Sequence, residues 1–291
     1  MDTRSCDLCP RLCTVDRPSG ELGFCGAPSA TIIASVAPHF GEEPVLVGRR
    51  GSGTIFLSGC SLGCPFCQNA DISHDVVGTP VSAVGAAEIM LEIERAGCVN
   101  VNLVTPTHFA QDLAEAIGIA RSRGLAVPVV WNCGGYESLE TLRDLDGLVE
   151  IYMPDFKYWD PVRAGEILGL RDYPAVAREA HREMFRQVGD LRVGPDGVAT
   201  RGLLVRHLVM PGGVAEGKSI VDFLADEISP ETAVNVMEQY RPAFRAAEHP
   251  AIDRRTSREE WRAVRDHARE RGLRLADSAL SPTTEDVDEP R

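Results

Sequence analysis

Apolar residues follow two different patterns along this chain, and the two patterns alternate from residue 54 onward. Short apolar runs rich in β-branched residues predict strands, whereas apolar residues three or four positions apart predict helices. The predicted strands span 54–59, 100–105, 127–132, 149–156, 203–212 and 232–240. The predicted helices span 81–97, 109–124, 138–146, 172–188, 214–228 and 257–272.

Strands that alternate with helices predict a parallel sheet joined by right-handed crossovers. The six strand–helix units of this chain are too few to close an eight-stranded barrel. We therefore expect an α/β fold, a partial (β/α)6 TIM-like barrel. One further strand, 31–37, precedes these units and is separated from them by a loop rich in Gly and Pro.

The two ends of the chain show neither of these apolar patterns. Residues 1–30 hold four cysteines between Gly and Pro residues, and they predict a small loop module stabilised by something other than an apolar core. Residues 276–291 are polar and acidic and contain Pro, so they predict a disordered tail. The predicted domains are therefore a cysteine-rich metal-binding module at 1–30, the barrel at 31–275 and the acidic tail at 276–291.

Charge and composition narrow the classes of partner. The 291 residues carry a net charge of −13, which argues against nucleic acid and against an anionic membrane surface, since both attract a basic face. No apolar run is long enough to cross a bilayer, and the first residues lack the apolar core of a secretory signal. Nine cysteines without such a signal indicate a reducing compartment, so we expect a cytoplasmic protein whose clustered thiols bind metal.

Three cysteines lie close together in "SGCSLGCPFCQN", residues 58–69, directly after the first strand of the predicted barrel. Loops at the carboxyl ends of such strands build active sites. Three soft thiolates, those of Cys60, Cys64 and Cys67, suit zinc or an iron–sulfur cluster. A [4Fe–4S] cube bound by three cysteines leaves one iron without a protein ligand, and that iron can hold a small molecule. A zinc site is the alternative reading of the same spacing.

Four consecutive strands end in polar residues, in the segments "VTPTHF", "WNCGGYE", "MPDFKYWD" and "RHLVMPGG". Core strands do not need polar side chains at these positions. Each of them taken alone is explained equally well as a helix cap or turn residue. Together they predict a polar rim around a cofactor, formed by Thr105, Thr107, Asn132, Asp155 and Lys157.

The C-x3-C-x2-C spacing, with the aromatic Phe66 before the last cysteine, resembles the signature of the radical S-adenosylmethionine superfamily. The resemblance implies a partial barrel of the radical S-adenosylmethionine type and a [4Fe–4S] cluster on Cys60, Cys64 and Cys67. In that superfamily the free iron binds S-adenosylmethionine. One electron from the reduced cluster then cleaves the cofactor to methionine and a 5′-deoxyadenosyl radical, which removes a hydrogen atom from the substrate.

Between about residues 31 and 245 the chain is most similar to pyruvate formate-lyase activating enzymes, in the branch with an N-terminal cysteine module. Those enzymes carry Gly-Gly-Glu after the second strand, where this chain has Thr105-Pro106-Thr107, so the threonines would contact the amino group of S-adenosylmethionine. "DFK" resembles their Asp-Leu-Lys, which suits Lys157 to the methionyl carboxylate. "RHLVMPG" resembles their Arg-x-x-x-x-Pro-Gly, with His207 facing the adenosyl group or, alternatively, buried in the core. The implied cofactor-binding residues are Phe66, Thr105, Thr107, Asn132, Asp155, Lys157 and His207.

The first cysteine module has the spacing C-x2-C-x3-C-x11-C. Four thiolates in a stretch without a core predict a second, closed metal site. Zinc, a rubredoxin-like iron and an auxiliary [4Fe–4S] cluster that relays electrons all fit this spacing. The predicted ligands are Cys6, Cys9, Cys13 and Cys25.

Three functions follow from these features. The first is a radical enzyme that generates a glycyl radical on a partner enzyme, with an electron donor such as flavodoxin or ferredoxin, as the resemblance implies. The second is a radical enzyme that acts on a small molecule or on another protein residue. The third is a non-catalytic zinc or electron-transfer module, which would not cleave S-adenosylmethionine.

Overall fold

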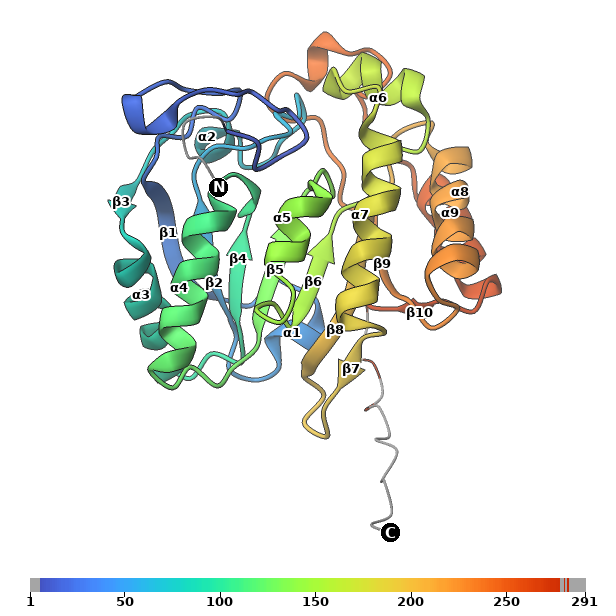
Figure 1. Cartoon of the computed structure of the whole chain (residues 1–291). Coiled ribbons are helices and arrows are strands. Elements are labelled where there is room, and N and C mark those ends of the chain that lie inside the picture. Colours follow the sequence, from blue (N-terminus) through green and yellow to red (C-terminus); the bar gives the residue numbers. More distant parts are fainter. Residues whose placement is uncertain (1–5, 278–279, 281, 283–291) are drawn as a thin grey trace.

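A single mixed sheet forms the centre of the computed structural model, which describes residues 6–277, 280 and 282 (Figure 1). Its strands are β1 (Thr31–His39), β2 (Ser52–Leu57), β3 (Thr79–Val81), β4 (Val101–Val104), β5 (Val129–Cys133), β6 (Ile151–Pro154), β7 (Arg192–Val193), β8 (Ala199–Leu208), β9 (Ala233–Met237) and β10 (Arg274–Leu275). Their order in the sheet is β10-β9-β8-β6-β5-β4-β2-β1-β3, and β7 pairs with β8.

The helices are α1 (Pro44–Val47), α2 (Ala70–Ser73), α3 (Ala83–Arg95), α4 (Ala110–Ser122), α5 (Leu139–Asp144), α6 (Pro161–Leu168), α7 (Tyr173–Val188), α8 (Val214–Phe223) and α9 (Arg258–Glu270). The longer ones cover the outer face of the sheet, whereas α1 packs against its inner face (Figure 1). Short helical turns add η1 (Arg17–Ser19), η2 (Thr107–Phe109), the π-helical η3 (Leu224–Ile228) and η4 (Ala246–Glu248).

The predicted alternation of strands and helices is confirmed. Strands β2, β4, β5, β6, β8 and β9 pair in parallel in this order, and a helix follows each of them. The sheet does not close on itself within the described residues, because its path ends at β3 on one side and at β10 on the other. The fold is therefore the predicted partial barrel.

One edge of the sheet departs from the predicted parallel arrangement. β1 pairs antiparallel with β2, so that His39 lies opposite Ser52, and β3 pairs antiparallel with β1. The connection from β1 to β2 contains only the four-residue α1. A parallel pair needs a crossover of a dozen or more residues, usually with a longer helix, whereas an antiparallel pair can be joined by a short turn.

Two apolar clusters fix the barrel wall. Strand residues such as Leu57, Leu103 and Trp131 are fully buried beneath the outer helices. Inside the barrel, Leu46 of α1 packs in a second cluster that includes Met153 of β6. Since α1 follows the end of β1 that lies beside the start of β2, this cluster fills the barrel at the amino ends of the parallel strands.

The elements that the sequence pattern did not predict are all short. A helical or strand period needs several repeats to be visible, and α1, α2, β3, β7 and β10 have four residues or fewer. The eight-residue α6 contains Gly165, against which the stem of Arg171 packs. The predicted helix 214–228 is divided into α8 and the π-helical η3.

The chain ends bear on the predicted domains. Among the described residues before β1, the only helical or strand element is the three-residue η1. Ala276 is buried and Asp277 pairs with Arg265 at 2.7 Å, while most of the predicted tail, at 278–279, 281 and 283–291, lies outside the described residues. The division into module, barrel and tail stays a prediction. No helix in the described part of the chain is both long enough and apolar enough to span a membrane.

Candidate active site

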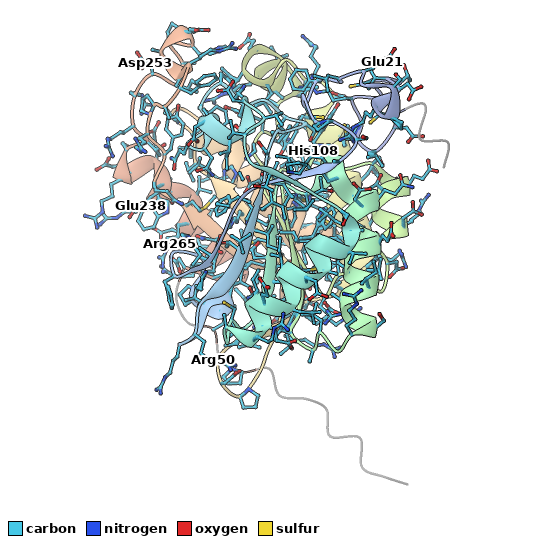
Figure 2. All side chains as sticks on the ribbon, turned by 90° about the vertical axis from the view of Figure 1, so that its left-hand side faces the viewer. Glu21, Arg50, His108, Glu238, Asp253 and Arg265 are labelled. Atoms are coloured by element: carbon cyan, nitrogen blue, oxygen red, sulfur yellow. The ribbon has the colours of Figure 1, made fainter. Side chains whose placement is uncertain are left out.

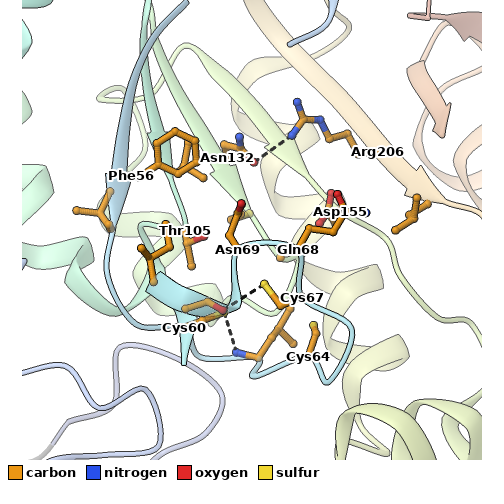
Figure 3. Close-up of a pocket in the computed structure, with 18 of the residues that line it drawn as sticks. Phe56, Cys60, Cys64, Cys67, Gln68, Asn69, Thr105, Asn132, Asp155 and Arg206 are labelled. Carbon is orange, nitrogen blue, oxygen red and sulfur yellow. Dashed lines mark hydrogen bonds between the residues drawn. The ribbon is translucent and has the colours of Figure 1, made fainter. Parts of the chain in front are cut away.

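The carboxyl ends of the parallel strands surround a cavity of about 390 Å³. The loop after β2 forms one wall with Cys60, Cys64 and Cys67, and Figure 3 shows these residues together on that side of the pocket. The opposite wall comes from the ends of β4, β5, β6 and β8. Three thiols and a polar rim that lie far apart in the sequence therefore face one space.

Hydrogen bonds hold two of the three thiols in place. The backbone N–H of Leu62 donates to Cys60 Sγ at 3.4 Å, and the hydroxyl of Ser73 in α2 donates to Cys67 Sγ at 3.1 Å. Hydrogen bonds to sulfur tune a bound metal centre as well as orienting its ligands. The sequence analysis did not single out Ser73, although its position six residues after Cys67 is a usable signal.

The third thiol is buried, and a cation compensates for its burial. Burial raises the pKa of Cys64 to about 12, and the nearby ammonium group of Lys157 opposes this rise. His74 Nε2 lies 3.1 Å from the carbonyl oxygen of Cys64 and fixes the backbone there. Metal ligation requires the thiolate, so the charge of Lys157 favours the form of Cys64 that binds metal.

Lys157 itself is held as a cation by its neighbour. Its ammonium group forms an ion pair with Asp155, and both residues line the cavity. Burial alone would lower the pKa of Lys157, but the charge and hydrogen bond of Asp155, together with the charges of Cys64 and Tyr173, outweigh that effect and the pKa is raised. The hydroxyl of Tyr173 accepts a hydrogen bond from the backbone N–H of Lys157 at 2.9 Å and fixes the strand end.

Two further predicted rim residues, Thr105 and Asn132, also line the cavity. Thr105 has a φ of 60°, which is rare for a β-branched residue and costs about 1–3 kcal/mol. Its N–H donates to the carbonyl oxygen of Asn132 at 2.8 Å, and this hydrogen bond joins the ends of the neighbouring strands β4 and β5. Phe66 is buried in the cavity wall. Its ring packs edge to face against the rings of Tyr158 and Tyr240, with ring centres 6.3 and 6.0 Å apart.

His207 faces away from the cavity, and its neighbour Arg206 faces into it. His207 is 2% exposed, and its Nδ1 donates to the carbonyl oxygen of Phe156 at 2.7 Å on the outer side of β8. Successive residues of a strand point to opposite faces, so only one of this pair can line the barrel. The sequence pattern predicts His207 at the cavity, whereas the structure brings Arg206 there instead.

Arg206 marks the boundary between the cavity and a second one of about 380 Å³. Its guanidinium group is bound by two carboxylates of the segment after β1, those of Glu42 and Glu43. Glu42 and Arg206 line both cavities, and the second cavity continues past Asn235 of β9 to the unpaired side of the barrel. Figure 3 shows Arg206 turned toward Asn132. These contacts form a polar partition between the two cavities.

Thr107 also points away from the cavity. It lies in η2, and its hydroxyl donates to Glu137 Oε1 at 2.7 Å. Glu137 is 2% exposed, and burial raises its pKa to about 7. The sequence analysis placed Thr107 on the rim because it follows β4, but the helical turn directs its side chain to the back of the sheet.

The pKa of Glu137 leads to a prediction for stability. The folded protein binds the Glu137 proton more tightly than the unfolded chain does, so this residue stabilises the fold below about pH 4.5 and the contribution is lost as the pH rises toward 7. Over that interval the contribution of Glu137 to the free energy of unfolding falls by about 1.4 kcal/mol per pH unit. Replacing Glu137 by Gln should flatten this part of the dependence of the unfolding free energy on pH, as measured by urea denaturation. The same replacement of the exposed Glu115 on α4 is the control, and an unchanged pH profile in Glu137→Gln would contradict the prediction.

The N-terminal cysteine module packs directly on the three-cysteine loop. Gly59 has a φ of 84°, and a Cβ there would lie 2.6 Å from the carbonyl oxygen of Cys25. Arg17 donates to the carbonyl oxygen of His108 at 2.7 Å, and His108 Nε2 lies 2.8 Å from the carbonyl oxygen of Ser58. Figure 2 shows His108 inside the molecule and Glu21 of the module at its edge.

The four cysteines of the module lie near one another. Burial raises the pKa of Cys9 to about 12, and the charges of Cys25, Cys13 and Cys6 contribute to the rise. All nine cysteines of the chain are free thiols. Among the described residues, no group of three or more His, Cys, Asp or Glu side chains has the geometry of a site for a single metal ion. The soft donor set of each cysteine group fits an iron–sulfur cluster, and metal binding at both groups stays a prediction.

Comparisons with known proteins place this architecture. No protein-family model matches the chain. The uncharacterized protein MJ0674 of Methanocaldococcus jannaschii is 30% identical over 267 residues, which are 88% of this chain and 72% of that protein. Streptococcus suis SuiB bound to S-adenosylmethionine superposes with a TM-score of 0.53 at 14% identity, over 74% of this chain and 47% of SuiB. SuiB bound to its precursor peptide SuiA superposes with a TM-score of 0.50 at 14% identity, over 74% of this chain and 46% of SuiB.

The likeness to SuiB concerns the fold. At this level of identity it says nothing of individual site residues, and the chain spans about half the length of SuiB.

Proposed function

The chain belongs to the family of the archaeal protein MJ0674, and we propose that it is a radical S-adenosylmethionine enzyme of the oxidoreductase class. The observation that carries this proposal is the convergence of Cys60, Cys64 and Cys67 on one cavity at the open end of a partial barrel. The cavity of about 390 Å³ has the size of a small-molecule site, since such pockets commonly measure about 300–1,000 Å³.

In this proposal the three thiolates hold a [4Fe–4S] cluster. When bound, the cluster supplies one electron for the reductive cleavage of S-adenosylmethionine to methionine and a 5′-deoxyadenosyl radical, which takes a hydrogen atom from the substrate. Leu62 and Ser73 orient two of the thiolates, and Phe66 shields the loop with its buried ring.

The residues opposite the thiols bind S-adenosylmethionine in this proposal. Lys157 is a compact, half-buried cation and suits the methionyl carboxylate, while Asp155 helps to keep it charged and oriented. Thr105 and Asn132 offer a hydroxyl and an amide to the polar end of the same molecule. Thr107 and His207 have no part in it, because their side chains turn away from the cavity.

We also propose a second metal centre, zinc or iron–sulfur, in the N-terminal module. What supports it is the group of four mutually close thiols, which lies in a segment with little secondary structure of its own. Its ligands would be Cys6, Cys9, Cys13 and Cys25.

The substrate in this proposal is a polypeptide, such as the glycine loop of a glycyl radical enzyme, and the electron donor is a flavodoxin or ferredoxin. SuiB shares the fold and has been solved with a precursor peptide bound. The second cavity supports this choice, since it provides a further polar surface beside the first one, on the β9 side of the barrel. Its walls carry Glu42, Glu43 and Arg206, which can bind peptide backbone groups.

Turnover without substrate tests the proposed class directly. Protein reconstituted anaerobically with iron and sulfide should be brown, and after reduction with dithionite it should convert S-adenosylmethionine to 5′-deoxyadenosine, as measured by mass spectrometry. Intact cluster with no cleavage would refute the proposal. Zinc at the three cysteines with no cleavage would identify the chain as a non-catalytic module. A glycyl radical signal in electron paramagnetic resonance after addition of a partner enzyme would select the activating-enzyme function over one on small molecules.

A further inference from the structure

Arg11, in the middle of the N-terminal cysteine module, reaches across to the three-cysteine loop. Its Nε donates to the carbonyl oxygen of Ser61 at 2.9 Å, and its Nη2 donates to the carbonyl oxygen of Leu62 at 3.1 Å. The planar guanidinium group thus holds two consecutive carbonyl groups with two donors, a geometry that lysine cannot reproduce. The contact joins residues 50 positions apart.

These two carbonyl groups belong to the peptide units that face the Cys60 sulfur. The carbonyl of Ser61 and the N–H of Leu62 form one peptide group, and that N–H donates to Cys60 Sγ at 3.4 Å. The carbonyl of Leu62 and the N–H of Gly63 form the next one. Both N–H groups are directed at the Cys60 sulfur. Arg11 therefore binds the carbonyl oxygen of each peptide group whose N–H points at the Cys60 sulfur.

Arg11 is in turn fixed by the module. Its guanidinium carbon lies 3.5 Å from the centre of the Phe24 ring, and this ring also covers Gly63, where a Cβ would lie 2.8 Å from it. The next residue, Leu12, donates its N–H to the carbonyl oxygen of Cys9 at 3.1 Å. The segment around Arg11 is thus tied to the first cysteine group, while the Arg11 side chain reaches the peptides around a sulfur of the second.

We infer that Arg11 is a positioning residue that raises the reduction potential of the centre bound at Cys60, and that the N-terminal module serves to present it. The inference rests on the proposed function, because it takes Cys60 as a cluster ligand. Reduction adds negative charge, and N–H donors aimed at a cysteine sulfur stabilise that charge. A guanidinium cation at the carbonyl ends strengthens both donors by polarising the peptide groups.

The test is a redox titration of the reconstituted protein, followed by electron paramagnetic resonance of the reduced cluster. Replacing Arg11 by Gln should lower the equilibrium constant for one-electron reduction about tenfold, which corresponds to a potential about 59 mV more negative. Arg11→Lys should restore part of the shift, because one ammonium group can serve only one of the two carbonyls. Iron content is measured in parallel, so that loss of cluster is not mistaken for a change in potential.

Arg17→Gln is the matched control. Arg17 also ties the module to the barrel, through the carbonyl of His108, but it does not touch the peptides that face Cys60. The reduction potential of the cluster in the Arg17→Gln variant should stay at the wild-type value. Equal potentials in the wild type and Arg11→Gln, or equal shifts in both Gln variants, would overturn the inference. If Arg11→Gln fails to retain a cluster, Arg11→Lys decides, and a wild-type potential in that variant would overturn it. A wild-type protein that binds no cluster would instead refute the proposed function.

Discussion

Replacing Cys64 by alanine should abolish formation of 5′-deoxyadenosine and remove most of the iron bound at the three-cysteine loop. Cys64 is the buried member of the three, and no other thiol lines the same wall of the cavity except Cys60 and Cys67. Loss of a residue that merely supports a metal ligand typically costs about 10- to 100-fold in affinity or activity, so loss of a ligand should cost more than about 100-fold. Iron analysis and mass spectrometry of the reaction measure the two effects.

Two other cysteine variants make this result specific. Cys98 is buried beside β4, outside both cysteine groups, so Cys98→Ala should leave iron content and turnover unchanged. Cys6→Ala should lose metal from the N-terminal module and retain part of the cleavage activity. Undiminished cleavage in Cys64→Ala would contradict the assignment of the catalytic centre, and identical losses in Cys6→Ala and Cys64→Ala would show that the two centres are not separable.

Replacing Lys157 by methionine should weaken binding of S-adenosylmethionine, and iron analysis in parallel accounts for any cluster lost because Lys157 also favours the Cys64 thiolate. Lys157 is the half-buried cation opposite the thiols, and its removal leaves Asp155 without its partner. Truncating one member of a buried, hydrogen-bonded charge pair at a binding site costs about 2 kcal/mol or more, which is a factor of about 30 or more in Kd. Anaerobic calorimetry with S-adenosylmethionine measures this change.

The chain provides its own control for this experiment. Lys157 and Lys218 are the only lysines, and Lys218 lies in α8 on the outer layer of the barrel. Lys218→Met should bind S-adenosylmethionine as the wild type does. Thermal unfolding of both variants separates a binding defect from a loss of stability. Equal affinities in Lys157→Met and the wild type would remove Lys157 from the proposed binding site.

The order of elements was predictable because local patterns encode it. Runs such as "VPVVWN" and "TAVNVMEQY" are apolar and β-branched enough to indicate buried parallel strands, which β5 and β9 confirm. The antiparallel pairing of β1 was not predictable in this way, because it depends on a short connection whose α1 leaves no periodic signal.

The orientation of individual side chains at the site was less predictable. His207 and Arg206 are adjacent, and a shift of one residue in the phase of β8 decides which of them enters the barrel. Thr107 follows its strand by only a few residues, but η2 turns it toward Glu137. A strand-end pattern identifies the segment that reaches the rim and leaves open the direction of each side chain within it.

The sequence by itself determined the alternating fold and the cysteine spacing, because apolar periodicity and the spacing of thiols are local properties of the chain. Only the tertiary structure decided which polar residues face the thiols. It also decided that Arg11, within the first cysteine module, donates hydrogen bonds to the peptide carbonyl groups next to Cys60. The physical reason is that such contacts join residues 50 or more positions apart, and their geometry depends on the pleat of the strands and on how loops pack, which no local pattern records.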